Sequence, residues 1–183
     1  MGFFKSIRLR FHHRYLRQEL QQQKRRPRSV NWDDAVNVGI LFDATELSAR
    51  QTALRYQEKL KSLGKQVRLL GFFDDDNSDP NFTFWHFNRK QFDWALRPTA
   101  SEVREFIETA FDLLINIEPV TRLHSEYIAA LSKAQLKVGP ATDNLYSYDL
   151  MIEPRDRGHI EGFIQQIEGL LKITTTRNET AKI

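Results

Sequence analysis

The chain has 183 residues, of which 40% are hydrophobic and 28% are charged, a composition typical of one globular domain rather than a disordered chain. It contains no cysteine, which excludes disulfides, thiolate nucleophiles and cysteine-based zinc sites. No apolar run approaches the roughly 18 residues of a membrane helix, and the start lacks a signal-peptide hydrophobic stretch. We therefore expect a soluble cytoplasmic protein.

The net charge of +3 hides an uneven distribution. Residues 1–29, which we call the arm, hold one acidic residue, Glu19. The arm also holds nine basic residues: Lys5, Arg8, Arg10, Arg14, Arg17, Lys24, Arg25, Arg26 and Arg28. Subtracting the arm's charge of +8 from the total of +3 leaves −5 for residues 30–183. The sequence thus predicts an acidic body with a cationic N-terminal arm.

The arm has the residue spacing of an amphipathic helix. Apolar side chains recur in it at three- and four-residue steps: Phe4, Ile7, Phe11 and Tyr15, with Leu16 and Leu20 beside this stripe. Arginines occupy the intervening positions. The helix should end before Pro27, which cannot continue it, and the body should start near Val30.

Within the body, short apolar runs alternate with longer amphipathic ones. The runs predict strands at residues 36–42, 66–73, 82–87, 112–117, 136–138 and 148–152, and helices at 47–63, 98–109, 123–134 and 158–171. The polar tail from Thr174 should fray. Most strand runs are continuously apolar, which indicates a sheet covered by helices on both faces.

The fold class that follows is α/β: a three-layer Rossmann-like sandwich with a mostly parallel sheet, preceded by the basic amphipathic helix. The strand-helix-strand order favours parallel pairing with right-handed crossovers. We divide the chain into the arm (1–29), the α/β domain (30–173) and the polar tail (174–183). The domain already contains every predicted strand, so we expect it to fold without the arm.

Ligands of such folds bind beyond the carboxyl ends of the strands, near the point where the strand order reverses. Asp43, Thr45, Asn116 and Glu118 follow two predicted strands and form a possible ligand pocket there. Neither a G-x-G-x-x-G loop nor a P-loop motif occurs. We therefore favour Asp43 and Thr45 as helix caps and expect no cofactor and no tightly bound nucleotide. A small-molecule enzyme acting on a nucleotide or sugar-phosphate at these strand ends is an alternative.

Metal-binding and nucleophile motifs are missing from the sequence. The acidic residues Asp74, Asp75, Asp76 and Asp79 lack the glycine and the final glutamate of an EF-hand loop, so we favour a solvated loop. The five histidines show no metal-ligand spacing, and no G-x-S-x-G elbow occurs. We expect no metal site and no catalytic residue.

The densest aromatic segment spans residues 82–94. Its rings are Phe82, Phe84, Trp85, Phe87, Phe92 and Trp94, and Arg89, Lys90 and Arg97 lie among or beside them. Aromatic faces next to basic groups can stack the bases of a single strand. Alternation nevertheless places half of the rings in the core, and we favour core and edge packing.

Four strings resemble an uncharacterised Bacteroidetes family of small α/β proteins. They are GILFDA at 39–44, FDLLIN at 111–116, YIAALSKA at 127–134 with KVG at 137–139, and YDLMI at 148–152. The resemblance spans about residues 30–155 and implies a bacterial cytoplasmic protein, but no activity, because that family has no assigned function. The region around the strand at 112–117 is more weakly similar to the N-terminal half of heptosyltransferase-type glycosyltransferases, whose nucleotide-sugar lies mainly against a second domain.

These observations favour a non-catalytic binding protein whose arm docks on RNA, with the ribosome as the favoured partner. Exposed arginines on a helix suit phosphate backbones, and the positive charge is concentrated in the arm. One alternative is an arm that lies on an anionic membrane surface. Another is an accessory subunit that docks on a protein complex through the arm, and a third is an arm that packs on its own body.

Overall fold

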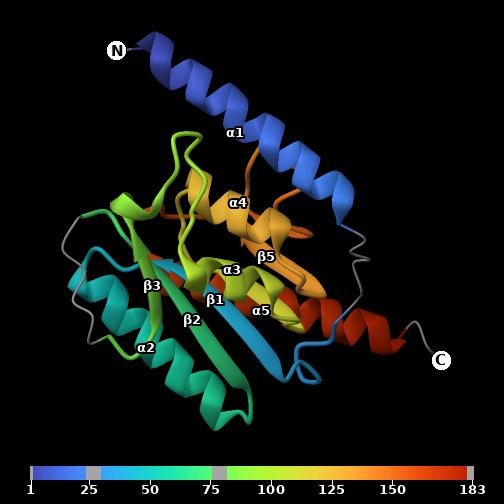
Figure 1. Ribbon diagram of the computed structural model, residues 1–183. Coiled ribbons are helices and arrows are strands. Elements are labelled where there is room, and N and C mark those ends of the chain that lie inside the picture. Colours follow the sequence, from blue (N-terminus) through green and yellow to red (C-terminus); the bar gives the residue numbers. More distant parts are fainter. Residues whose placement is uncertain (1, 24–29, 76–81, 181–183) are drawn as a thin grey trace.

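The computed structural model describes residues 2–23, 30–75 and 82–180, and Figure 1 shows their arrangement. Six parallel strands form one sheet in the order β3-β2-β1-β4-β5-β6. They are β1 (Asn37–Asp43), β2 (Gln66–Phe73), β3 (Trp85–Asn88), β4 (Leu113–Asn116), β5 (Leu136–Pro140) and β6 (Leu150–Ile152). The strand order reverses between β1 and β4, which is where Rossmann-like sheets bind ligands. The predicted fold class is confirmed.

Helices cover both faces of the sheet (Figure 1). They are α1 (Gly2–Gln22), α2 (Leu47–Ser62), α3 (Ser101–Glu108), α4 (Leu123–Leu131) and α5 (Ile160–Thr180). Ile40 and Phe42 of β1 point into the core under α2 and α5, whereas Leu41 points into the core under α3 and α4. The continuously apolar strands are thus explained by burial on both sides.

Three helices differ from their predicted bounds by three residues or more, and one of them is α4, which ends at Leu131 instead of residue 134. Residues 91–99 form a hairpin, in which Phe92 and Pro98 form an antiparallel bridge and the Thr99 amide donates to the Gln91 carbonyl. This hairpin uses the residues expected to start a helix, and α3 begins only at Ser101. At the other end, α5 continues to Thr180, beyond the expected end near residue 171. Neither glycine nor proline occurs between residues 170 and 180 to stop it.

The predicted N-terminal helix is present as α1, and it lies across the outer side of α4 (Figure 1). Leu16 is only 2% exposed and belongs to the same core as α3 and α4. Phe4, by contrast, is 76% exposed. The buried face is therefore centred on His12 and Leu16, not on the stripe that begins at Phe4. No helix among residues 2–23, 30–75 and 82–180 is both long and apolar enough to cross a membrane.

Candidate functional site

The inner side of α1 is fixed to the body by polar contacts over the stretch from Arg8 to Gln23. Arg8 Nε donates to the Trp94 carbonyl over 2.6 Å, and the His12 ring nitrogen Nδ1 lies 3.1 Å from the Ala95 carbonyl. Near the other end, the Gln23 amide donates to the Leu131 carbonyl. Burial lowers the pKa of His12, so its ring is neutral at pH 7 and fits this site without a counter-ion.

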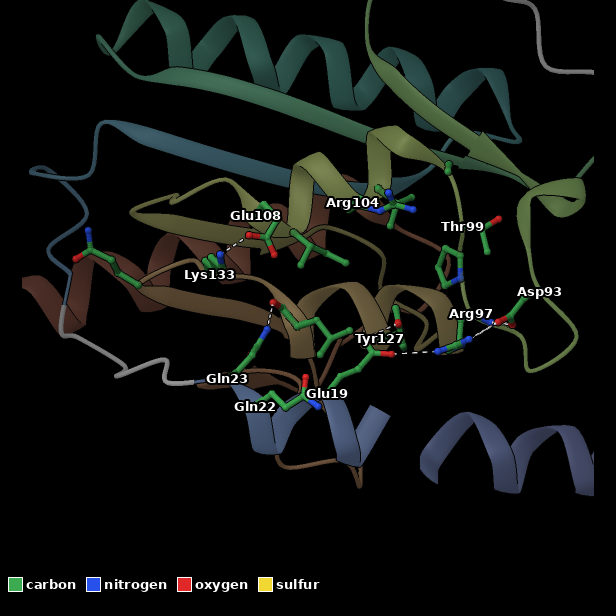
Figure 2. Close-up of a pocket in the computed structure, with 16 residues that line it drawn as sticks. Glu19, Gln22, Gln23, Asp93, Arg97, Thr99, Arg104, Glu108, Tyr127 and Lys133 are labelled. Atoms are coloured by element: carbon green, nitrogen blue, oxygen red, sulfur yellow. Dashed lines mark hydrogen bonds and ion pairs between the residues drawn. The ribbon is translucent and has the colours of Figure 1, made fainter. Parts of the chain in front are cut away.

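A cavity of about 990 Å³ lies along the seam between α1, α3, α4 and the 91–99 hairpin (Figure 2). Most of its charged lining is paired. Arg97 bonds to both Glu19 and Asp93, and the Tyr127 hydroxyl donates to Glu19 over 2.9 Å. On the opposite wall, Lys133 pairs with a glutamate of α3. Several of these contacts join α1 to the body, so α1 is a fixed part of the domain surface.

The outer side of α1 carries arginines that face solvent. Arg10, Arg14 and Arg17 are exposed and line a shallow groove of about 430 Å³ together with His13, Gln18 and Gln21. None of the three arginines forms a hydrogen bond or an ion pair with another residue that the structure describes. Helical spacing places them along one side, in a row about 10 Å long. They form a candidate polyanion-binding surface, which we call the arginine row.

The six other predicted arm cations do not belong to the arginine row. Lys5 is exposed near the start of α1, whereas Arg8 is already committed to the Trp94 carbonyl. Four lie outside the described residues: Lys24, Arg25, Arg26 and Arg28. The structure thus brings together three of the nine predicted contacts as one row.

The carboxyl edge of the sheet brings together the other predicted residues at the strand-order reversal. Asp43 is the last residue of β1 and Glu118 follows β4, and Arg122 lies between them. Arg122 pairs with Asp43, and its Nε lies 3.7 Å from a Glu118 carboxyl oxygen. The Ser125 hydroxyl lies 3.1 Å from both oxygens of that carboxyl group. Arg122 and Ser125 could not be found by sequence reasoning, because no motif marks them.

Thr45 and Asn116 also have protein partners at this edge. The Thr45 hydroxyl accepts the Asp74 amide over 2.8 Å, and Asn116 donates to the buried Tyr148 hydroxyl over 2.7 Å. The prediction that Asp43 and Thr45 cap a helix is wrong: α2 begins after Glu46 without a side-chain cap. Asp43 instead accepts the Thr45 amide within the turn. The four predicted pocket residues therefore lie at one edge, each bonded to the protein.

Burial shifts the pKa values of two residues at this edge in opposite directions. It raises the pKa of Glu118 to about 8, although the nearby Arg122 acts the other way. It lowers the pKa of His124 to about 3, and this ring lies 4.0 Å from the ring of Phe72, centroid to centroid. At pH 7 both side chains are therefore neutral, and Glu118 is a protonated acid.

The shift of Glu118 predicts how stability changes with pH. The folded chain keeps a proton on Glu118 up to about pH 8, while the unfolded chain loses it near pH 4.5. The stabilisation that this raised pKa contributes to the folded state is therefore complete below pH 4.5 and is lost as the pH rises through 8. His124 and His12 act oppositely below pH 6.5, where unfolded histidine takes up a proton. Between pH 6.5 and 8 the change in stability that is due to Glu118 is therefore not opposed by the two histidines.

We expect the wild-type protein to lose about 1 to 2 kcal/mol of unfolding free energy between about pH 6.5 and pH 8. Glu118→Gln, which cannot ionise, should remove most of this loss. Urea unfolding at both pH values measures it, and Glu153→Gln, at an exposed glutamate after β6, is the control that should behave like wild type. Equal pH dependence in Glu118→Gln would show that another group titrates.

Residues 74 and 75 are the described part of the predicted acidic loop. Asp74 pairs with Arg89 over 2.6 Å, and this bond lowers the pKa of Asp74. Asp76 and Asp79 lie outside the described residues. Within the described ranges, no group of three or more histidine, cysteine, aspartate or glutamate side chains is placed to hold a metal ion.

The sequence of this chain matches the model of a protein family over residues 8–174. The chain belongs to the DUF6913 family, a family of unknown function. No curated protein matches the sequence. The DUF6913 match begins within α1 and ends within α5, so it includes the buried face of α1 together with the whole sheet. This membership in a family of unknown function is consistent with the uncharacterised family that the sequence resemblance led us to expect.

Proposed function

We propose that this DUF6913 protein is a non-catalytic RNA-binding protein of the bacterial cytoplasm, with the ribosome as its favoured partner. The observation that carries the proposal is the arginine row on the outer side of α1. Three guanidinium groups face solvent on a helix whose other side is fixed to the body. Because the helix is already formed and docked, binding a phosphate backbone costs little ordering of the main chain.

Charge pairing elsewhere on the molecule supports this choice. Several cations of the body are matched by carboxylates, among them Arg55 with Glu161 and Lys59 with Glu168. The arginine row has no such carboxylate partner among the described residues. The body's net charge of −5 should repel a polyanion and orient the molecule with α1 toward it.

The proposal predicts salt-dependent RNA binding. If about half of the nine arm cations engage, the log-log slope of affinity against salt should be about −3 to −4. The triple substitution Arg10→Gln, Arg14→Gln and Arg17→Gln should reduce this slope by about 2 to 3 and weaken binding more than tenfold at low salt. Fluorescence anisotropy with labelled RNA, at about 50 and about 200 mM salt, measures both quantities.

A matched control removes the same charge from the body. Arg104→Gln, Arg155→Gln and Arg157→Gln change three exposed arginines outside α1 and should leave the slope within experimental error of wild type. An unchanged slope in the α1 variant, or an equal loss in the control, would contradict the proposal. Stronger retention of the wild type on anionic vesicles than on RNA would favour the membrane alternative.

The enzyme alternative has one supporting feature, which is the buried Glu118 at the strand-order reversal, whose pKa burial raises to about 8. Perturbed carboxyl groups at such positions are candidates for acid-base chemistry. Here Arg122 lies across this edge and pairs with Asp43, so a ligand would have to displace an ion pair to reach Glu118. For this reason we rank RNA binding first.

A further inference from the structure

The tip of the 91–99 hairpin holds an exposed tryptophan on a fixed backbone. Trp94 is 54% exposed, and the residue after it, Ala95, is fully buried. Asp93 closes the turn: its carbonyl accepts the Leu96 amide over 3.0 Å, and its carboxylate accepts both the amide and the side chain of Arg97. Leu96 has a φ of +61°, a conformation uncommon for a residue with a side chain. These hydrogen bonds of Asp93 thus fix the conformation of the turn.

Helix α1 contacts the same hairpin tip. Two successive carbonyls of the tip are engaged, that of Trp94 by Arg8 and that of Ala95 by His12. The rings of Phe11 and Tyr15 lie 4.9 and 6.5 Å from the Trp94 ring, both in edge-to-face geometry. The indole is therefore placed at a defined position on the flank of α1 that carries Phe11 and Tyr15, while over half of its surface remains in solvent.

Phe11 lies between the indole and the arginine row. Phe11, which touches Trp94, precedes Arg14 by three residues, and side chains three apart on a helix are neighbours, with about 5 to 6 Å between their Cβ atoms. An aromatic platform therefore lies beside a line of phosphate-binding groups. Single-stranded nucleic acids are bound by this combination, because their bases are free to stack while their phosphates follow the cations. In a duplex the bases are already stacked and paired.

We propose that the ligand of α1 is single-stranded RNA, with a base stacked on Trp94 while the backbone follows the arginine row. This inference rests on the proposed RNA-binding function and narrows it to unpaired strands. A bilayer fits the surface less well, because two leucines of α1 pack on the body instead of facing solvent. Leu16 is buried and Leu20 is half-buried in the core. Phe4, Leu9 and Phe11 are the large apolar side chains that α1 leaves exposed among its described residues.

The test uses the full-length chain and two labelled RNAs of the same sequence, one an unstructured single strand of about 15 nucleotides and the other its duplex. Trp94→Ala should weaken single-strand binding roughly 5- to 100-fold, leave the salt slope unchanged and leave duplex binding unaffected. Trp94→Phe keeps a stacking ring and should retain most of the affinity. Leu63→Ala, at an exposed leucine after α2, is the control that should bind like wild type.

Fluorescence gives a second readout that does not depend on the stability of the alanine variant. The difference between the wild-type and Trp94→Phe emission spectra reports Trp94, and single-stranded RNA should quench this difference signal. Wild-type affinity in a folded Trp94→Ala variant, or an unquenched difference signal, would overturn the inference. A blue shift of this signal with anionic vesicles, without quenching by RNA, would also overturn it.

Failure of this inference is distinguishable from failure of the proposed function. If the variant of the arginine row loses RNA affinity while Trp94→Ala does not, the protein binds RNA phosphates without stacking. In that case only the narrower inference is overturned. If the variant of the arginine row binds as wild type does, the proposed function itself fails.

Discussion

Leu16→Ala should lower the free energy of unfolding by about 2 to 5 kcal/mol, the usual cost of truncating a buried leucine. Leu16 is 2% exposed and packs into the core that α3 and α4 cover. Urea unfolding followed by circular dichroism measures the loss. Gln18→Ala, at an exposed position of the same helix, should change stability by no more than about 0.5 kcal/mol.

This prediction bears on whether the arm is dispensable. The sequence led us to expect that residues 30–183 fold without it, whereas the structure places His12 and Leu16 in buried positions against the body. Deleting α1 would expose the surface that these residues cover, so we now expect truncation to cost at least as much as Leu16→Ala. A loss below about 1 kcal/mol in Leu16→Ala would show that α1 is not docked in solution.

Gly139→Ala should destabilise the domain by about 1 to 3 kcal/mol or more, through overpacking. A methyl group at Gly139 of β5 would lie 2.4 Å from Tyr148 Cε1. The Tyr148 ring is buried, and its hydroxyl accepts the amide of Asn116 at the carboxyl edge. The ring cannot move aside without disturbing that bond. Thermal unfolding of the variant should show a lower midpoint.

Gly169→Ala supplies the opposite control. Gly169 lies in α5, and a Cβ there would meet no atom within 4 Å. Alanine favours a helix over glycine by about 0.5 to 1 kcal/mol, so this variant should be more stable than wild type. If Gly139→Ala were as stable as wild type, the close contact between β5 and Tyr148 would not exist in solution.

The sheet was predictable because its signal is local. Strands buried on both faces are continuously apolar, and β1, β2 and β4 stand out in the sequence for that reason. The 91–99 hairpin was missed because it depends on contacts with α1 and on a left-handed leucine, Leu96, that no residue preference predicts. Local patterns therefore predicted the layers but not this connection.

The candidate sites were predictable only in part. Asp43 and Glu118 could be placed at one edge, because parallel strands end on the same side of a sheet. Arg122, which joins them, comes from the loop before α4, and its role depends on tertiary structure. For α1, periodicity predicted a helix but not which side is buried. The body selects the side with Leu16, and leaves Phe4 in solvent.

The contact between Gln23 and Leu131 joins residues that are synthesised at different times. The two residues are 108 positions apart, so at about 5 to 20 residues per second α1 leaves the ribosome on the order of 5 to 20 s before α4 is complete. The 91–99 hairpin emerges part-way through that interval and α4 only at its end, so Leu16 is at first covered by neither. A nascent chain therefore presents a cationic segment whose apolar side is uncovered. The solubility of a chain with a tag fused before α1 matters first at this stage of synthesis.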